Sequence, residues 1–290
     1  MNMLNDRHKK WIYLAGGVAA VGLIVLAYLI GVGMSHVTTD DAYVTGRIHS
    51  IASKVPGTVW KLNVNDNQNV GRGDLLVEID PVDYALRVNE AKAALEVSRA
   101  ALAQAARDKA RAEALYQDKV LPKDKYEHAL TDYQLAKAKN EEDAQKLKIA
   151  QQNLKYTKIY SPARGYVTQR SVEAGNQIQA GQPLMAVVPL DDIWVVANYK
   201  ETQLKDVRPG QRVMIRVDTY PGKVFRGRVD SIMAGTGAVF SLFPPENALG
   251  NYVKVVQRIP VKIVFDKTTD EGHVLRVGMS CVPTILTKDE

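Results

Sequence analysis

The chain has 290 residues, of which 46% are hydrophobic and 24% charged, and its formal net charge is +6 at pH 7. This length allows two or three small domains. The single cysteine, Cys281, excludes an intramolecular disulfide framework and a cysteine-based metal cluster. The basic residues are spread along the chain without an aromatic-flanked basic patch, which argues against nucleic-acid binding.

The N-terminal residues predict a membrane anchor. Residues 1–10 form a polar tail, and residues 11–34 contain no charged side chain. A helix of that length, at about 1.5 Å per residue, spans a hydrocarbon core of roughly 30 Å. The alternative is a cleaved signal peptide. The apolar run is longer than the usual ~7–15 residues, however, and no convincing small-residue cleavage site follows it.

Charges on either side of the apolar run predict its orientation. Arg7, Lys9 and Lys10 precede it, whereas Asp40 and Asp41 follow it. Under the positive-inside rule the short tail is cytoplasmic and the rest of the chain lies outside. In a Gram-negative cell, the chain would be a single-pass inner-membrane protein whose bulk is periplasmic.

Residues 82–156 predict an antiparallel helical hairpin. The stretch 74–164 contains no glycine, and Pro122 is its only proline between Pro81 and Pro162. Because proline is disfavoured inside a helix, this pattern predicts two long helices that meet just before Pro122. An ordinary two-helix unit of a larger helical domain is the alternative, but neither arm has a second apolar stripe.

The two predicted helices each carry one stripe with 3-4 spacing, which is typical of a coiled-coil seam. Lys109, Asn140 and Asp143 interrupt this stripe. Its other members are Val88, Ala91, Leu95, Ser98, Leu102, Ala105, Ala112, Tyr116, Ala129, Tyr133, Ala136, Leu147, Ala150 and Leu154.

Residues 54–81 and 157–190 predict two halves of one β domain. The segment 56–79 matches the segment 108 positions later, with strand-like runs separated by turns. A half-sheet that cannot bury its face alone would close against its twin. The turn glycines of the two halves are Gly57, Gly73, Gly165 and Gly181.

The remaining segments also predict β structure. Residues 35–53 predict a membrane-proximal strand, and residues 191–271 a small antiparallel β-barrel with alternating apolar and polar positions. Residues 272–290 predict a C-terminal membrane-proximal segment in which 274–286 pairs with 37–48. The loop 235–250 is long enough to suggest a functional or mobile segment. Its candidate residues, with one from the following strand, are Gly235, Gly237, Phe240 and Arg258.

No pattern for catalysis or cofactor binding emerges, and we expect the protein not to be an enzyme. The five histidines lie far apart without metal-ligand spacing, and no nucleophile-elbow or phosphate-loop pattern occurs. The tripeptide 108–110, Asp-Lys-Ala, imitates a lipoylation site but falls in the middle of a predicted helix. Lys109 is therefore interpreted as structural, with its stem along the seam.

The sequences VPGTVWKLNVNDNQNVGRGDLLVEID and SPARGYVTQRSVEAGNQIQAGQPLMAVV resemble the two half-motifs of a lipoyl/biotinyl-type domain split by a helical hairpin. That layout is similar to HlyD-type membrane fusion proteins, or periplasmic adaptors. The segments TTDDAYV, WVVANYKETQLKDVRPGQRV and GTGAVFSLFPPENALGNYVKVVQRIPVKI most resemble EmrA-like multidrug efflux adaptors. The resemblance implies a membrane-anchored α+β fold containing a split lipoyl-like domain, its inserted coiled coil and a β-barrel.

The resemblance also implies a function without a cofactor. The chain would link an inner-membrane transporter, for the EmrA type a major-facilitator drug/proton antiporter, to an outer-membrane channel of the TolC type. It would do so as a homo-oligomer in contact with membrane lipid. A non-transport envelope tether or scaffold is the second hypothesis. A lipoyl-type acyl carrier is the third, and the anchor and the occupied turn argue against it.

The predicted hairpin tip is the candidate docking site. Adaptors that meet an outer-membrane channel often carry Arg, Leu four residues on, and Ser seven residues after that. Arg111 and Leu115 fit this spacing, but Pro122 replaces the serine. Val120 and Leu121 add an apolar pair at the turn. The alternative is that Arg111 is solvated and Leu115 merely packs the tip.

The charge asymmetry around residues 11–34 gives a topology prediction. A reporter that is active only outside the cytoplasm, fused after Glu290, should be active because the positive-inside rule retains the basic tail in the cytoplasm. Colony assays with the reporter check this, and a cytoplasm-only reporter at the same position serves as the control. Activity of that control would contradict the periplasmic location.

Overall fold

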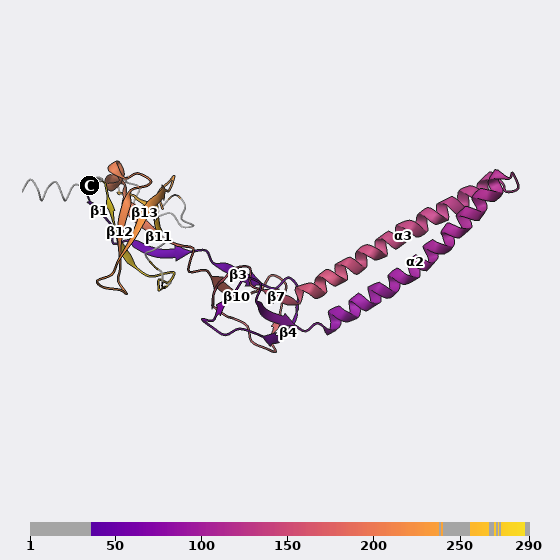
Figure 1. Ribbon diagram of the computed structural model, residues 1–290, viewed down its shortest axis with the longest axis horizontal. Coiled ribbons are helices and arrows are strands. Elements are labelled where there is room, and N and C mark those ends of the chain that lie inside the picture. The colour runs from indigo at the N-terminus through magenta and orange to yellow at the C-terminus, as the bar shows by residue number, and fades with distance from the viewer. Residues whose placement is uncertain are drawn as a thin grey trace, which may run out of the picture. The chain divides into compact units, whose positions relative to one another are not determined.

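The structure is a computed structural model that describes residues 36–237, 239, 256–266, 270, 272 and 274–287 (Figure 1). The predicted anchor, including Arg7, Lys9 and Lys10, lies outside these residues. Within the described part of the chain, no helix combines the length and apolar character needed to cross a membrane. The chain divides into two compact units, residues 48–189 and residues 1–47 with 190–290.

Residues 48–189 form two four-stranded sheets and a helical hairpin. The sheet orders are β3-β10-β8-β5 and β7-β6-β4-β9, so each sheet contains strands from both halves of the duplicated sequence. The strands are β3 (His49–Ala52), β4 (Gly57–Leu62), β5 (Asn69–Val70), β6 (Leu75–Ile79), β7 (Lys158–Tyr160), β8 (Gly165–Thr168), β9 (Gln177–Ile178) and β10 (Pro183–Val188).

Hydrogen bonds that join the two halves occur at equivalent positions of the 108-residue repeat. The amide of Val59 donates to the carbonyl of Asn176 at 2.9 Å, and the amide of Val167 donates to the carbonyl of Gln68 at 3.0 Å. Val59 and Gln68 correspond to Val167 and Asn176 in the 108-residue repeat, so each of these hydrogen bonds is the counterpart of the other. The two halves are therefore related by a pseudo-twofold arrangement, which confirms the predicted duplication. The repeat also includes β3 and β7. Residues 49–52 therefore pair inside this domain, whereas the sequence predicted them in the membrane-proximal strand.

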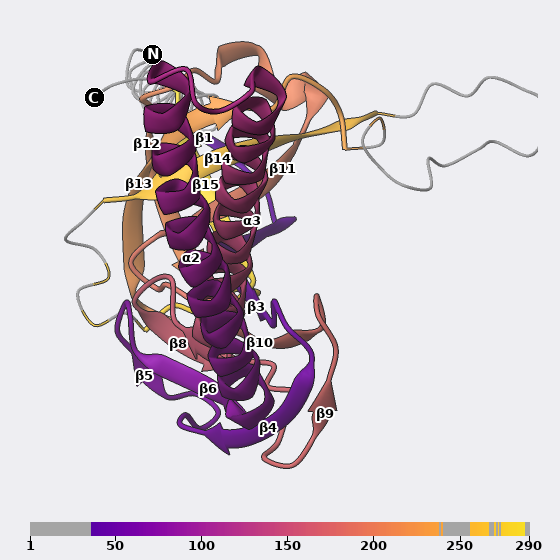
Figure 2. The ribbon, with the colours of Figure 1, turned by 90° about the vertical axis from the view of Figure 1, so that its right-hand side faces the viewer.

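The hairpin leaves this domain between β6 and β7. It consists of α2 (Val82–Gln117, 36 residues) and α3 (Lys123–Tyr156, 34 residues), which lie side by side (Figure 2). The predicted seam positions are half-buried or buried along the hairpin, apart from Tyr116 at the tip, so the seam is confirmed. At the base, the Ile79 amide donates to the Thr157 carbonyl at 2.8 Å, and the buried Tyr84 hydroxyl donates to the Pro56 carbonyl at 2.6 Å.

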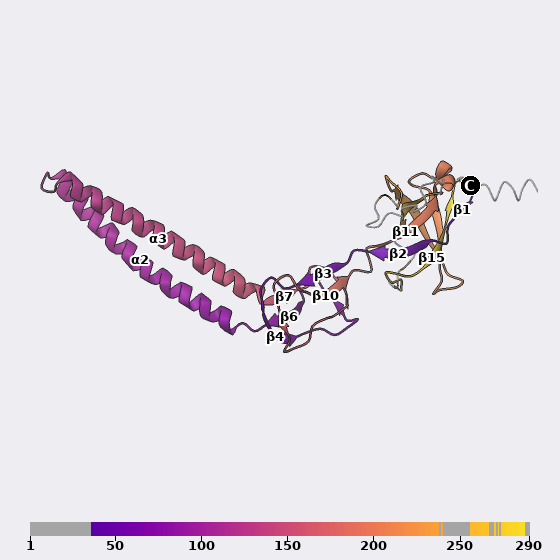
Figure 3. The same cartoon turned by 180° about the vertical axis from the view of Figure 1, so that it is seen from behind.

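The other unit contains one seven-stranded antiparallel sheet of order β1-β15-β12-β13-β14-β11-β2 (Figure 3). Near its ends the sheet closes, because the Val44 amide donates to the Met279 carbonyl at 2.8 Å and Tyr43 bridges to Ser280. The elements are β1 (His36–Thr38), β2 (Ala42–Gly46), β11 (Ile193–Lys200), the 3-10 helix η1 (Glu201–Asp206), β12 (Arg212–Val217), β13 (Val224–Ile232), β14 (Arg258–Phe265) and β15 (Cys281–Leu286).

The barrel core consists of the inward-facing residues of these strands, as the period-two pattern predicted. Tyr199, Phe225 and Ile263 are fully buried in it. The Tyr199 hydroxyl donates to the Pro283 carbonyl at 3.1 Å, which satisfies the one polar atom of that side chain. Burial, with a smaller contribution from the Asp218 charge, raises the pKa of the Cys281 thiol to about 12. Cys281 is therefore a structural residue of the core.

The first and last β segments belong to this barrel. The predicted pairing of 274–286 with 37–48 is confirmed, since β15 pairs with β1 through Val37 and Ile285. β15 also pairs with β12 on its other side. β1 and β15 therefore belong to the barrel sheet, whereas the sequence predicted separate membrane-proximal segments with boundaries at 53 and 271.

The hydrogen-bonded base predicts that the β domain folds without the arms of the hairpin. Replacing residues 88–152 by a short Gly-Asp-Gly turn keeps Tyr84 and Leu154, which pack against the β core. The shortened chain should retain its β signal in circular dichroism and a cooperative thermal transition. An otherwise identical deletion that also removes Tyr84 should melt lower, and loss of the β signal in the first variant would contradict the prediction.

Candidate functional site at the hairpin tip

The tip is a closed five-residue turn, 118–122, between α2 and α3. The amides of Val120 and Leu121 both donate to the Leu115 carbonyl, at 2.9 and 3.2 Å. Lys119 adopts a left-handed conformation, with φ of +57°, and Pro122 precedes α3 in an extended conformation. Proline at this position fixes φ without removing a helix hydrogen bond, so the turn is locally pre-organised.

Apolar side chains collect at this turn. Val120 is 71% exposed and Leu115 44%, whereas Leu121 is half-buried. The Tyr116 and Tyr126 rings stack across the two helices, with centroids 5.1 Å apart and planes 5° from parallel. We refer to Leu115, Tyr116, Val120, Leu121 and Tyr126 as the tip patch. The sequence predicted the three aliphatic members, but not the tyrosine pair, which depends on the register of the two helices.

Arg111 lies one turn before Leu115 and points into solvent. Its guanidinium forms an ion pair with Asp108 of the same helix, and its side chain is 72% exposed. The hydrogen bond from Arg111, followed by one from Gln104, lowers the pKa of Asp108. An exposed pair of this kind contributes little to stability, so the structure gives Arg111 no essential role in the fold.

The four turn glycines have structural roles. Gly73 and Gly181 occupy equivalent turns with φ of +90° and +83°, a region that disfavours side chains. A side chain at Gly57 would collide with Ile79, and one at Gly165 with the Val188 carbonyl. These positions preserve the fold of the two halves and do not come together as a site.

The predicted barrel loop is only partly within the described residues. Gly235 and Gly237 lie after β13, and the Gly237 amide donates to the Arg258 carbonyl at 3.2 Å. Arg258 forms an ion pair with Asp41 on the adjoining edge of the barrel. Phe240 lies outside the described residues, so a functional role for this loop stays a prediction.

Two sets of comparisons relate this architecture to known proteins. Residues 47–190 match the barrel-sandwich hybrid domain of RND membrane fusion proteins, and residues 192–238 match a CusB-like β-barrel domain. The chain is 38% identical to the probable multidrug resistance protein EmrK of Escherichia coli K12, covering 88% of this chain and 78% of that protein. It is 36% identical to the multidrug export protein EmrA of the same strain, covering 86% and 76%.

The chain belongs to the EmrA/EmrK group of membrane fusion proteins. A solved membrane fusion protein, Spr0693 of Streptococcus pneumoniae R6, has the same fold, with a TM-score of 0.66 over 88% of this chain and 99% of that one at 16% identity. Proteins of this family are adaptors rather than enzymes. Within the described residues, no group of three or more His, Cys, Asp or Glu side chains could hold a metal ion.

Lys109 of this membrane fusion protein lies in the coiled coil, as predicted. Its ammonium is 5.5 Å from the centre of the Tyr133 ring and 3.7 Å from a Glu113 carboxylate oxygen. In a lipoyl domain the modified lysine would occupy the turn between the two half-motifs, and here the hairpin replaces that turn. The structure therefore gives Lys109 a packing role.

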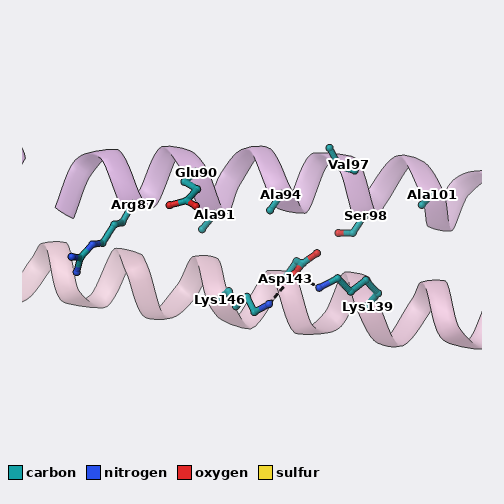
Figure 4. Close-up of a pocket in the computed structure, with 10 residues that line it drawn as sticks. All are labelled: Arg87, Glu90, Ala91, Ala94, Val97, Ser98, Ala101, Lys139, Asp143 and Lys146. Atoms are coloured by element: carbon teal, nitrogen blue, oxygen red, sulfur yellow. Dashed lines mark hydrogen bonds and ion pairs between the residues drawn. The ribbon is translucent and has the colours of Figure 1, made fainter. Parts of the chain in front are cut away.

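The hairpin also contains a polar break in its seam. The Asp143 side chain is only 6% exposed and faces α2, flanked by the ammonium groups of Lys139 at 3.1 Å and Lys146 at 3.7 Å (Figure 4). Ser98 faces it from α2, and the small residues Ala91 and Ala94 leave a groove of about 700 Å³ along this part of the hairpin. A buried charge at such a seam position fixes register at a cost in stability.

This break predicts that Asp143→Leu stabilises the hairpin. Leucine would fill the alanine-lined groove and remove a carboxylate that is costly to desolvate, so the free energy of unfolding should rise by about 1 kcal/mol. Thermal and urea unfolding followed at 222 nm measure the change. Glu142→Leu is the matched control, because Glu142 contacts the same two lysines but is exposed. Destabilisation by Asp143→Leu alone would show that the buried ion pair is favourable.

Proposed function

We propose that the chain is the adaptor subunit of a multidrug efflux system, connecting an inner-membrane transporter to an outer-membrane channel through its hairpin tip. The relationship to multidrug export and resistance proteins along most of the chain carries this proposal. The structure adds a physical basis, since a hairpin of 36 and 34 residues is about 50 Å long and ends in an exposed apolar patch. A major-facilitator transporter and a TolC-type channel are the partner classes that fit the EmrA-like resemblance.

The exposed flanks of the hairpin support assembly of several copies. Val97 is 72% exposed, Leu135 64% and Ile149 61%, although all three lie on helices whose apolar seam is already used. Exposed aliphatic side chains on a thin two-helix unit are well placed to contact a neighbouring hairpin. A homo-oligomer would also compensate for the small area that the alanine-rich seam buries.

The competing proposal is an envelope tether that uses the same parts without a pump. The observation in its favour is Pro122, which stands where channel-docking adaptors carry serine. The two proposals differ in what the tip patch must do. An efflux adaptor requires a tight contact at the tip, whereas a tether tolerates a solvated one.

We predict that Leu115→Asp combined with Val120→Asp abolishes efflux-dependent resistance. Two carboxylates buried in a contact cost several kcal/mol, whereas on a solvated turn they cost little. Drug resistance should fall to the level of a strain lacking the adaptor, while the abundance of the protein and its helical signal stay normal. Arg111→Ala should lower resistance less, because its side chain is at the margin of the patch.

The matched control is Val82→Asp with Leu86→Asp, which adds the same charge to exposed apolar positions at the base of the hairpin, far from the tip and outside the proposed contact between copies. If the tip variant exports drugs normally at normal abundance, the tip is not a docking surface, and the tether proposal gains support. If both variants lose export equally, the loss is not specific to the tip, and the docking proposal fails.

A further inference from the structure

Arginine side chains lie on the outside of two adjacent barrel strands, β12 and β13. β12 and β13 present Arg212, Arg216, Arg226 and Arg228 on this face, and all four are exposed. The register places Arg212 directly opposite Arg228, and Met214 opposite Arg226. We refer to the four arginines as the arginine face. Like charges directly opposite each other destabilise a strand pair unless negative charge compensates them.

Within the described part of the chain, carboxylates are few around the arginine face, and Asp218 follows β12 directly. The outward positions of β1, β15 and β12, and those of β13 from 224 to 228, contain none. Asp266 lies 3.5 Å from Arg228, and Asp230 is paired with Lys262 at 3.3 Å. The side chains between the arginines are mostly apolar and partly exposed, namely Met214, Val224, Val282 and Leu286. The face therefore combines delocalised positive charge with apolar area.

The place where the chain joins the barrel indicates what this face meets. β1 begins at His36, two residues after the uncharged stretch 11–34. His36 pairs with Leu286, and the next strand along, β12, begins with Arg212 at the same end of β15. With neighbouring strands about 4.8 Å apart, the backbone at Arg228 lies only ~14 Å from His36. If residues 11–34 span the bilayer, the arginine face is close to its surface.

We propose that the arginine face binds the headgroups of anionic phospholipids in the membrane that anchors the chain. Guanidinium groups make paired hydrogen bonds to phosphate oxygens, and their aliphatic stems, with Met214 and Leu286, suit the apolar edge of the headgroup layer. Each basic side chain close to an anionic surface strengthens association about fivefold. The contact would hold the barrel against the bilayer. This inference rests on the membrane-anchored adaptor proposed above.

The test uses the full chain in lipid nanodiscs, with a donor fluorophore at Thr202→Cys and an acceptor on the lipid headgroups. Thr202 is an exposed residue of η1, and its neighbour Gln203 donates to the Thr38 carbonyl of β1 at 3.2 Å. The native Cys281 is 1% exposed, so the label goes to the introduced cysteine. Energy transfer should be greater in phosphatidylcholine with phosphatidylglycerol than in phosphatidylcholine alone, and high salt should reverse the increase.

The variant R212Q/R216Q/R226Q/R228Q should lose this increase, with the ratio of docked to undocked barrel falling at least about tenfold. The corresponding fourfold Arg→Lys variant keeps the positive charge and should keep most of the increase in energy transfer. A loss in the Arg→Gln variant alone is then due to the missing charge and not to misfolding. The control K92Q/K125Q/K148Q/K155Q removes the same charge from exposed hairpin positions and should behave like the unmodified chain.

The outcomes distinguish the lipid contact from the anchor and from a protein partner. Co-elution of the chain with the discs reports the anchor alone, and its absence would overturn both the anchor and the lipid contact. Equal energy transfer in the two lipid mixtures, in a chain that does co-elute, overturns the lipid contact only. The arginine face would then fit an acidic protein surface instead. An unchanged response in the arginine-to-glutamine variant also overturns the proposal.

Discussion

The structure depends on the exchange of strands between the two halves of the duplicated domain. β9 of the second half pairs with β4 of the first, and β5 of the first pairs with β8 of the second. Neither half can bury its apolar face without the other, so the two must assemble together. This exchange brings Ile79 and Thr157 within hydrogen-bonding distance and thereby sets the two starting points of the hairpin. The long hairpin can then project from this domain although its only apolar core is the seam between its two helices.

The seam itself is a compromise between close approach and stability. Alanine at many seam positions brings the two helices close together but buries little apolar area, and Asp143 adds a desolvation cost in the same region. The two ends of the hairpin have further contacts, namely the stack of Tyr116 on Tyr126 at the tip and the hydrogen bond from Tyr84 to the Pro56 carbonyl at the base. These contacts add aromatic stacking at the tip and a partly buried hydrogen bond at the base to a seam that buries little apolar area.

Local signals explain what the sequence could predict. The absence of glycine, the position of Pro122 and the 108-residue repeat depend on neighbouring residues or on self-similarity, and they predicted the hairpin, its seam and the two half-domains. The barrel boundaries were harder. The pairing of β1 with β15 was predicted, but no local pattern indicated that β15 also pairs with β12 and so belongs to the barrel. The Tyr116–Tyr126 stack and the opposed Arg212 and Arg228 likewise require a register that only the folded chain supplies.

Pro122 stands where channel-docking adaptors carry serine, and this difference changes which interactions the tip can form. A serine hydroxyl could donate or accept a hydrogen bond, whereas Pro122 has neither a hydroxyl nor a backbone donor. Its fixed φ instead holds the turn that leaves Val120 71% exposed beside Leu115. In the proposed docking role, contact with this tip would therefore come mainly from apolar burial around the stacked tyrosines, with polar groups such as Arg111 at the rim. A partner groove that matches it would be lined by apolar side chains, and its selectivity would come from shape more than from hydrogen bonds.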